Sequence, residues 1–464
     1  MFRFARFRVP GAVVPAVVVL LFSAGASLLA QERAVLTESL RGTHAVVLTA
    51  SAEGTITPRP GDEPLPAEVR ATYRFRTRPL AVEGEGPTGR RSVRYYDAAG
   101  SELTVGPQRT YARLRGSRRT VVATGVPTGV KVLSPGGSLR YGELELLDTP
   151  LDPLLVGALL PPGSVSVGDN WEPELWVGPA LAGVEAVGES DLRCTLTALT
   201  DAEARGTFRG KIAGATDGAP LTVTLKGTFT FDRSAKTVTA ATLTQVVKSA
   251  PGPISPGTDL TFTADLTRTP NVAAGPLDAA LLKKAADAVR TPESIESAEL
   301  VELVTPWGVR AAFDRDWRFV TQTAQGAVVV RMELGDPIIA ATLTPRPDAK
   351  ADDGAEGAGG AEKPAAPQPD AAAFERRVRL TLEKNPGTIA ETASLDLPDP
   401  ADAGRALLLI RVNGRNADGE PKVRDHYLLA DGPKRAEIVF TYAPDRSEEM
   451  SDLAFPLLDA VRWR

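Results

Sequence analysis

Apolar and polar side chains alternate along most of the chain between residues 35 and 270. In "LTVTLKGTFTF" the apolar side chains occupy odd positions, and they are Leu221, Val223, Leu225, Phe229 and Phe231. The segment "DLTFTADLT" repeats this alternation from residue 259 onward. A period of two residues gives each strand one apolar face and one wettable face. We therefore predict a mainly-β antiparallel domain over residues 33–272, built on a curved or half-barrel sheet.

The period changes at residues 277–290, "LDAALLKKAADAVR". Leu277, Leu281, Ala285 and Ala288 lie on one stripe of a helix. The pair Thr291-Pro292 then ends the pattern, because the residue before proline disfavours helical backbone. We predict a helical connector over residues 273–297, followed by a second domain over residues 298–464.

The second domain opens on "PWGVRAAFDRDWRF", which holds two tryptophans. Trp307, Val309, Ala311 and Phe313 share one face of a predicted strand, "DRD" turns the chain, and Trp317 begins the next strand. Aromatic residues that share a strand face with aliphatic ones are typical of a core. We therefore interpret both tryptophans as core anchors and not as an aromatic binding site.

The remainder of the second domain alternates between helix and strand patterns. The segment 374–385 fits a helix or a strand, and we interpret it as a helix. Residues 405–443 predict three strands with Asp-Gly pairs at their turns. The closing segment 447–461 has helical spacing, with Ser447 as its N-cap and Pro456 expected to kink or divide it.

Four stretches of the second domain together resemble a known fold. "WGVRAAFDRDWRF", "IIAATLT", "HYLLADGPKRAEIVFTYA" and "FPLLDAVRW" look like the PsbP/Mog1-type domains across residues 298–464. The resemblance implies an α+β domain, an α/β/α sandwich on a central antiparallel sheet. It also implies a non-catalytic binding or assembly module, because members share no catalytic residues that could be transferred to this chain.

A shorter stretch in the first domain, "PPGSVSVGDNW", resembles a phrase of secreted bacterial β-rich domains of unknown function. The resemblance implies that Trp171 packs in the interior, while Gly168 and Asp169 shape a turn. Turn formation is the expected role of Asp169, with a ligand role as the alternative.

Two segments fall outside the domain patterns. Residues 346–373 consist almost entirely of alanine, glycine, proline and charge, and we predict a disordered insertion there. Residues 1–30 join three arginines to an apolar run, the pattern of a signal peptide cleaved after Ala26 or Ala30. This predicts a secreted or periplasmic protein without a stable transmembrane span. An uncleaved N-terminal anchor is the alternative.

Composition narrows the classes of function. The chain has 53 basic and 58 acidic side chains, which argues against a nucleic-acid partner. Its histidines, His44 and His426, and its one cysteine, Cys194, lie far apart, and no metal, phosphate-loop or nucleophile motif is present. We predict no metal, no cofactor and no enzymatic activity. A hydrolase with a dispersed active site stays open as the third alternative.

Arginine is concentrated between residues 90 and 119. On adjacent strands this cluster could form a basic face for an anionic polymer or lipid surface. The alternative is the ordinary solvated face of a sheet. The candidate contact residues are Arg91, Arg94, Arg113, Arg115, Arg118 and Arg119.

These patterns favour an exported, non-enzymatic bacterial envelope protein that acts as a binding or assembly module with a protein or envelope partner. The alternative is a periplasmic carrier of a lipid or other hydrophobic ligand in the first domain. An apolar concavity that the chain does not fill with its own side chains would favour the carrier. A cleft with convergent titratable groups and shifted pKa values would favour an enzyme.

Overall fold

The computed structural model describes most of the chain beyond the predicted signal peptide. The predicted signal peptide and positions 347–369 of the predicted insertion lie outside the described residues. The residues that the structure describes are 32–39, 41–80, 89–149, 151–216, 219–252, 255–291, 295, 298–305, 307–315, 317–324, 327–334, 339–346, 370–383, 386–395, 405–416, 418–431 and 433–463.

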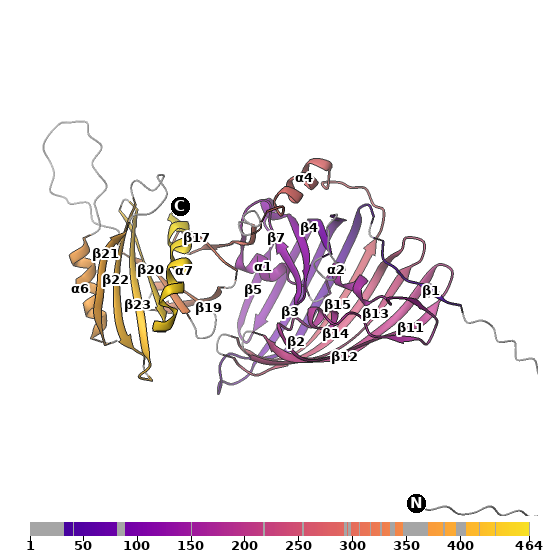
Figure 1. Ribbon diagram of the computed structural model, residues 1–464, viewed down its shortest axis with the longest axis horizontal. Coiled ribbons are helices and arrows are strands. Elements are labelled where there is room, and N and C mark those ends of the chain that lie inside the picture. Colours follow the sequence, from indigo (N-terminus) through magenta and orange to yellow (C-terminus); the bar gives the residue numbers. More distant parts are fainter. Residues whose placement is uncertain are drawn as a thin grey trace, which may run out of the picture.

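The first part of the chain is a curved antiparallel sheet, as the alternation predicts (Figure 1). It has twelve strands in the order β10-β11-β12-β13-β14-β15-β2-β3-β4-β6-β7, and β5 also pairs with β4. The strands are β2 His44–Thr57, β3 Leu65–Pro79, β4 Arg91–Val105, β5 Gln108–Arg113, β6 Thr120–Val126, β7 Gly129–Leu133, β10 Asn170–Trp171, β11 Ala186–Leu199, β12 Glu203–Thr216, β13 Ala219–Asp232, β14 Thr237–Ser249 and β15 Gly257–Thr269.

The chain between β7 and β11 covers the concave face of this sheet. Side chains from both halves of the sheet, such as Leu48 and Phe229, join one buried cluster with Leu147, Leu159 and Leu181 of this covering segment. Side chains from so many strands can contact one covering segment only if the sheet curves around that segment. The segment contains β8 Leu139–Arg140, α1 Tyr141–Leu147, α2 Pro153–Val156, η2 Gly157–Leu159, β9 Ser164–Val165, which pairs with β1 Ala34–Val35, and α3 Val177–Ala182.

The turn before β10 agrees with the expectation from "PPGSVSVGDNW". Trp171 is buried in the cluster, and its Nε1 donates to the carbonyl oxygen of Leu159 at 2.8 Å. Gly168 has a φ of 93°, a conformation that glycine adopts without strain. Asp169 accepts a hydrogen bond from the Ser166 amide at 2.9 Å, as a turn-forming aspartate does.

The predicted connector forms helix α4 Ala279–Asp287, capped by Asp278, whose carboxylate accepts from the Leu281 amide at 2.8 Å. Its apolar side packs on Val93 and Val122, which alternate along their strands with residues of the concave face. Helix α4 therefore lies on the outer face of the curved sheet (Figure 1).

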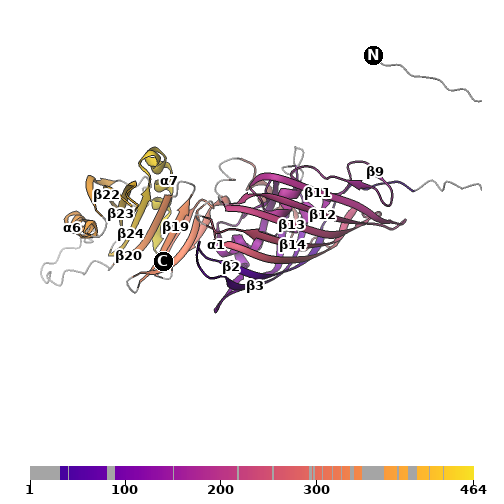
Figure 2. The same ribbon diagram turned by 90° about the horizontal axis from the view of Figure 1, so that it is seen from below.

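The second part is a seven-stranded antiparallel sheet in the order β18-β19-β20-β24-β23-β22-β21. Helix α6 Ala371–Leu382 packs on Leu408 and Ile410, whereas helix α7 Ser447–Ala460 packs on the cluster of Leu407 and Leu409. Adjacent residues of a strand face opposite sides, so the helices cover opposite faces (Figure 2). The strands are β18 Arg318–Ala324, β19 Ala327–Leu334, β20 Ile339–Arg346, β21 Gly387–Leu395, β22 Arg405–Arg415, β23 Pro421–Asp431 and β24 Lys434–Tyr442.

The tryptophan stretch lies in the core of this second part, as predicted. Trp317 is 2% exposed, and its ring meets Phe440 edge-on with the ring centroids 6.3 Å apart. Val309 and Phe313 of β17 Val309–Phe313 are buried in the same cluster, and Trp307 packs against it while partly exposed. Trp317 is therefore a core residue, and Trp307 packs at the margin of the same core.

A small four-stranded sheet joins the two parts in the order β25-β17-β16-β8. Strand β16 Val301–Val304 pairs in parallel with β8 of the first part, and β17 pairs with β25 Arg462–Trp463 near the end of the chain. The alternation pattern did not predict that residues 139–140 leave the main sheet and pair with the second part.

Three local predictions differ from the structure. Arg446, not Ser447, occupies the N-cap of α7, and the Ser447 hydroxyl donates to the carbonyl oxygen of Pro444 at 2.7 Å. Helix α7 runs unbroken through position 456, so Pro456 does not divide it. The predicted insertion is too long at its ends, because Arg346 closes β20 and Ala371 begins α6, which Asp370 caps.

Among the residues that the structure describes, no helix combines the length and the apolar surface needed to cross a bilayer.

Candidate functional site

Five small side chains form a row across the concave face of the first sheet. Ala112 of β5 pairs with Ser101, Ser101 with Ala71, Ala71 with Ala50, and Ala50 with Ala264 of β15. Directly paired residues of antiparallel strands point to the same face. With neighbouring strands about 4.8 Å apart, this small-residue row extends about 19 Å across β5, β4, β3, β2 and β15.

A cavity of about 450 Å³ lies over the small-residue row. Leu48 and Tyr73 border the row on one side, and Val69, Leu103 and Phe262 border it on the other. Because alanine and serine are shorter than these neighbours, the row forms a trough between two larger walls. The volume lies in the range of small-molecule binding sites.

Residues 140–149 and Leu151 form the roof of this cavity. Leu146 of α1 and Leu151 line it from above, and both are buried in the main core cluster. The floor is therefore mainly apolar, and the roof combines the buried Leu146 and Leu151 with charged side chains.

Charged side chains at the edge of the cavity form ion pairs that connect the first part to β16 of the small joining sheet. Arg115 donates from Nη2 to Glu143 Oε2 and from Nη1 to Glu302 Oε2, each at 2.6 Å. Burial would raise the pKa of Glu143, but the Arg115 guanidinium and the amides of Arg140 and Arg115 hold it below its ordinary value. Glu143 is thus an ionised, fully engaged carboxylate that ties α1 to β16.

Asp148 has a different environment on the same roof. Its carboxylate lines the cavity and has no hydrogen bond or ion pair with any described residue. Asp148 is exposed to solvent. Partial desolvation first, and the carboxylate of Asp152 second, raise the pKa of Asp148 above its ordinary value.

A buried ion pair fastens the roof to the sheet. Arg94 of β4 donates to both carboxylate oxygens of Asp152 at 2.6 and 2.5 Å, and each side chain is 1% exposed. Asp152 also accepts from the Leu154 amide at 2.8 Å and so caps helix α2. The Asp152 carboxylate therefore connects strand β4 to the first turn of helix α2.

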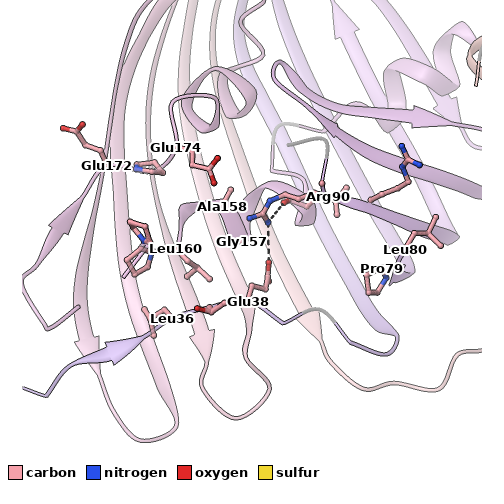
Figure 3. Close-up of a pocket in the computed structure, with 17 residues that line it drawn as sticks. Leu36, Glu38, Pro79, Leu80, Arg90, Gly157, Ala158, Leu160, Glu172 and Glu174 are labelled. Carbon is pink, nitrogen blue, oxygen red and sulfur yellow. Dashed lines mark hydrogen bonds and ion pairs between the residues drawn. The ribbon is translucent and has the colours of Figure 1, made fainter. Parts of the chain in front are cut away.

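A second hollow, of about 690 Å³, lies near the other end of this covering segment (Figure 3). Figure 3 shows Arg90 directed toward Glu38, 4.0 Å away, and Arg90 also donates to the carbonyl oxygen of Leu154 at 3.3 Å. Prolines and charges of both signs share its lining. Its wall includes Leu80 and Gly89, which flank residues outside the described part, so we assign it no ligand.

The structure separates the predicted basic residues. Arg94 is buried against Asp152, which corrects the expectation that it faces an anionic partner. Arg115 is engaged by two carboxylates. Arg91 donates to the Thr124 hydroxyl at 3.1 Å, and Arg118 donates to the carbonyl oxygen of Ser138 at 3.0 Å.

Arg113 and Arg119 remain exposed, and Arg113 lies beside the cavity at the end of β5. Contact of these two side chains with an anionic partner stays a prediction. The structure places Arg94 in the interior, so the six arginines do not form one basic face.

The two histidines and the cysteine are interior side chains. His426 Nδ1 lies 3.0 Å from the Glu437 carboxylate, and Cys194 is fully buried, which raises the pKa of its thiol to about 12. Burial would raise the pKa of Glu437, but His426 and Arg346 lower it below its ordinary value. Among the described residues, no group of three or more His, Cys, Asp or Glu side chains could hold a metal ion.

His44 is buried with neither ring nitrogen bonded within the described part, and burial first and Arg268 second lower its pKa. It stays neutral when folded, so its contribution to stability is present above pH 6.5, about its unfolded value. That contribution is lost as the pH falls through the lower folded pKa.

We expect a His44→Phe variant to lose less free energy of unfolding than the parent between pH 7 and pH 5. Urea unfolding at both pH values measures this, and parallel pH profiles would contradict it.

Comparison with known proteins does not identify the chain. No family model and no curated protein matches it. Solved structures with partial likeness include a Bacteroides thetaiotaomicron VPI-5482 protein (TM-score 0.22, 11% identity, covering 35% of this chain and 48% of that one). A Pseudomonas aeruginosa protein of unknown function, PA94, described as a putative regulator, has TM-score 0.21 and 11% identity over 33% of this chain and 90% of that one.

Lipovitellin, solved in a study of lipid–protein interactions, has TM-score 0.30 and 8% identity over 51% of this chain and 26% of that one. All three TM-scores are low, and these likenesses assign neither a family nor a function. These comparisons do not confirm the PsbP/Mog1 resemblance of the second part.

Proposed function

We propose that this protein is an exported envelope protein that binds a small hydrophobic or amphiphilic molecule in the cavity over the small-residue row. Of the two functions that the sequence favours, the carrier is the one that an unfilled apolar concavity supports. The observation that carries the proposal is the trough formed by Ala112, Ser101, Ala71, Ala50 and Ala264 beneath Leu146 and Leu151 of the roof.

The energetic basis is the transfer of hydrocarbon out of water. Each methylene group that leaves water for the apolar side chains of the floor and roof contributes about 0.8 kcal/mol. The site is already formed by packed secondary structure, so a ligand does not have to order the chain in order to bind. The ion pair of Arg94 and Asp152 contributes to this preorganisation because it holds the roof at a set height above the sheet.

A side chain that fills the trough should abolish binding. In Ala71→Phe, the ring would occupy the middle of the small-residue row, where Ala71 is 8% exposed. We expect the affinity for the apolar fluorophore N-phenyl-1-naphthylamine to fall at least about tenfold, which corresponds to about 1.4 kcal/mol. Fluorescence titration measures it, with circular dichroism to verify that the variant is folded.

The matched control is Thr72→Phe, which adds the same ring at the next position of β3 on the exposed outer face. We expect it to bind the fluorophore as the parent does. Equal binding by the folded Ala71→Phe variant and the parent would refute the proposal that the ligand occupies this cavity.

The second candidate function is an assembly module carried by a PsbP/Mog1-like second part. The specific observation that favours it is the placement of α6 and α7 on opposite faces of an antiparallel sheet. Recovery of the protein from its native envelope, with mass spectrometry of copurifying molecules, separates the two candidates. A reproducible lipid without a protein supports the carrier, whereas a reproducible protein without a lipid supports the assembly module.

A further inference from the structure

We propose that the second part of the chain responds to the ligand of the cavity through helix α1, which roofs the cavity and also packs against the core of the second part. Occupancy of the cavity and attachment of α1 to the second part therefore stabilise each other. This inference rests on the proposed ligand-binding function and specifies how that site is regulated. It follows from the packing of α1, from the strand before it and from one ion-pair network.

Helix α1 packs against the cores of both parts. Leu146 lines the cavity and is buried in the core of the first part. Leu144 packs against both cores, and Tyr141 packs against the core of the second part. Figures 1 and 2 show α1 at the end of the first part that faces the second part. The position of this helix is therefore set by contacts with both parts at once.

The strand before α1 connects the roof of the cavity to the second part. Leu139 and Arg140 of β8 pair with Val301 and Glu302 of β16. Leu139 is buried in the first core, whereas Val301 is buried in the second. Helix α1 begins at Tyr141, directly after β8, so no loop separates the helix from the paired strand. A displacement of α1 is consequently transmitted to β16.

An ion-pair network makes the same connection through side chains. Glu143 of α1 lines the cavity and accepts hydrogen bonds from Arg115 Nε at 2.8 Å and from Arg115 Nη2 at 2.6 Å. Nη1 of the same guanidinium donates to Glu302 at 2.6 Å. The guanidinium groups of Arg140 and Arg310 lie 3.7 and 3.8 Å from Glu302. Loss of the charge on Glu302 would leave these cations with less counter-charge beside the roof.

Thermodynamic linkage makes this connection work in both directions. A ligand that packs against Leu146 stabilises the position of α1 in which Leu144 also contacts the core of the second part. Ligand binding strengthens the attachment of α1 by the same factor by which that attachment strengthens ligand binding. The second part thereby detects whether the cavity is filled, which joins the carrier and the assembly module in one chain.

Two substitutions outside the cavity test this inference on the full-length protein. Glu302→Gln keeps the shape of the side chain and removes its charge, and Leu144→Ala removes an apolar contact with the second core. Neither Glu302 nor Leu144 lines the cavity. We expect each variant to bind N-phenyl-1-naphthylamine at least about threefold more weakly than the parent, the scale of coupling between linked sites. Fluorescence titration measures the affinities, and circular dichroism verifies that the variants are folded.

Glu299→Gln is the matched control. Glu299 forms an ion pair with Lys131 at 2.6 Å, and this pair also connects the two parts. Neither side chain lines the cavity or forms an ion pair with α1. We expect Glu299→Gln to bind the fluorophore within about twofold of the parent, since it leaves the contacts of α1 unchanged.

Amide hydrogen exchange in β16 measures the reverse direction of the coupling. In the parent, saturating fluorophore should slow the exchange of Val301–Val304 at least about threefold, although this strand does not line the cavity. In Ala71→Phe, whose added ring fills the cavity, the fluorophore should leave this exchange unchanged. If Glu302→Gln does not fold, Leu144→Ala and the exchange in the parent still decide the question.

Parent-like affinities of Glu302→Gln and Leu144→Ala, or exchange in β16 that the bound fluorophore does not slow, would overturn the inference while leaving the proposed function intact. Equal losses of affinity in Glu299→Gln and Glu302→Gln would also overturn it, because the effect would then not pass through α1. Absence of fluorophore binding by the parent would overturn both the inference and the proposed function.

Discussion

Replacing Arg94 by methionine will lower the free energy of unfolding by about 3–5 kcal/mol at pH 7, the scale observed when one partner of a buried ion pair is removed. Methionine restores most of the volume, so the loss reports on charge. Asp152 would remain 1% exposed without a counter-charge, and its hydrogen bonds from Arg94 at 2.6 and 2.5 Å would be gone. Urea unfolding followed by circular dichroism measures the change.

Arg119→Met is the control for this prediction, because Arg119 lies in the same arginine-rich stretch and is exposed. Its effect should stay within about 0.5 kcal/mol of the parent, as for most surface substitutions. A double variant, Arg94→Met with Asp152→Leu, should recover part of the loss because no charge is left buried. Recovery will be incomplete, since Asp152 also caps α2. Similar stabilities of Arg94→Met and Arg119→Met would contradict the prediction.

Replacing Trp317 by alanine will destabilise the second part by about 3–5 kcal/mol, the usual cost of deleting a large buried aromatic side chain. Trp317 is 2% exposed, and its ring packs edge-on against Phe440 of β24, within the core that α7 covers. The variant would lose this apolar contact and leave a void that packed strands can close only in part. Thermal and urea unfolding of the full chain measure the effect.

Trp307→Ala provides the matched control from the same stretch of sequence. Trp307 packs at the margin of the core and is partly exposed, so we expect a clearly smaller loss than for Trp317. Equal losses in the two variants would show that burial does not set the cost at these positions.

Much of the secondary structure could be predicted from local patterns. The two-residue alternation of Leu221 to Phe231 identified β13, and the stripe containing Leu277 and Ala285 identified α4. Trp317 was correctly interpreted as a core residue, whereas Trp307 packs against that core while partly exposed. These predictions succeed because the face of a strand or helix on which a side chain lies depends only on nearby residues.

The candidate site could not be predicted in the same way. Ala50, Ala71 and Ala264 are unremarkable in sequence, and each resembles an ordinary small residue in a strand. They become neighbours only through the register of β2, β3 and β15, which pairs segments from opposite ends of the first part. The arginine cluster shows the converse: its members are close in sequence, but strand alternation turns Arg94 into the core.

The sequence by itself determined the long alternating strands of the first part, helix α4, the apolar face of each of these elements, and Trp317 as a core residue. All of these follow from short-range periodicity. Only the tertiary structure decided the small-residue row, the cavity above it, the pairing of Arg94 with Asp152 and the position of Asp148. The physical reason is that these features depend on strand register and sheet curvature, which arise from contacts between residues far apart along the chain.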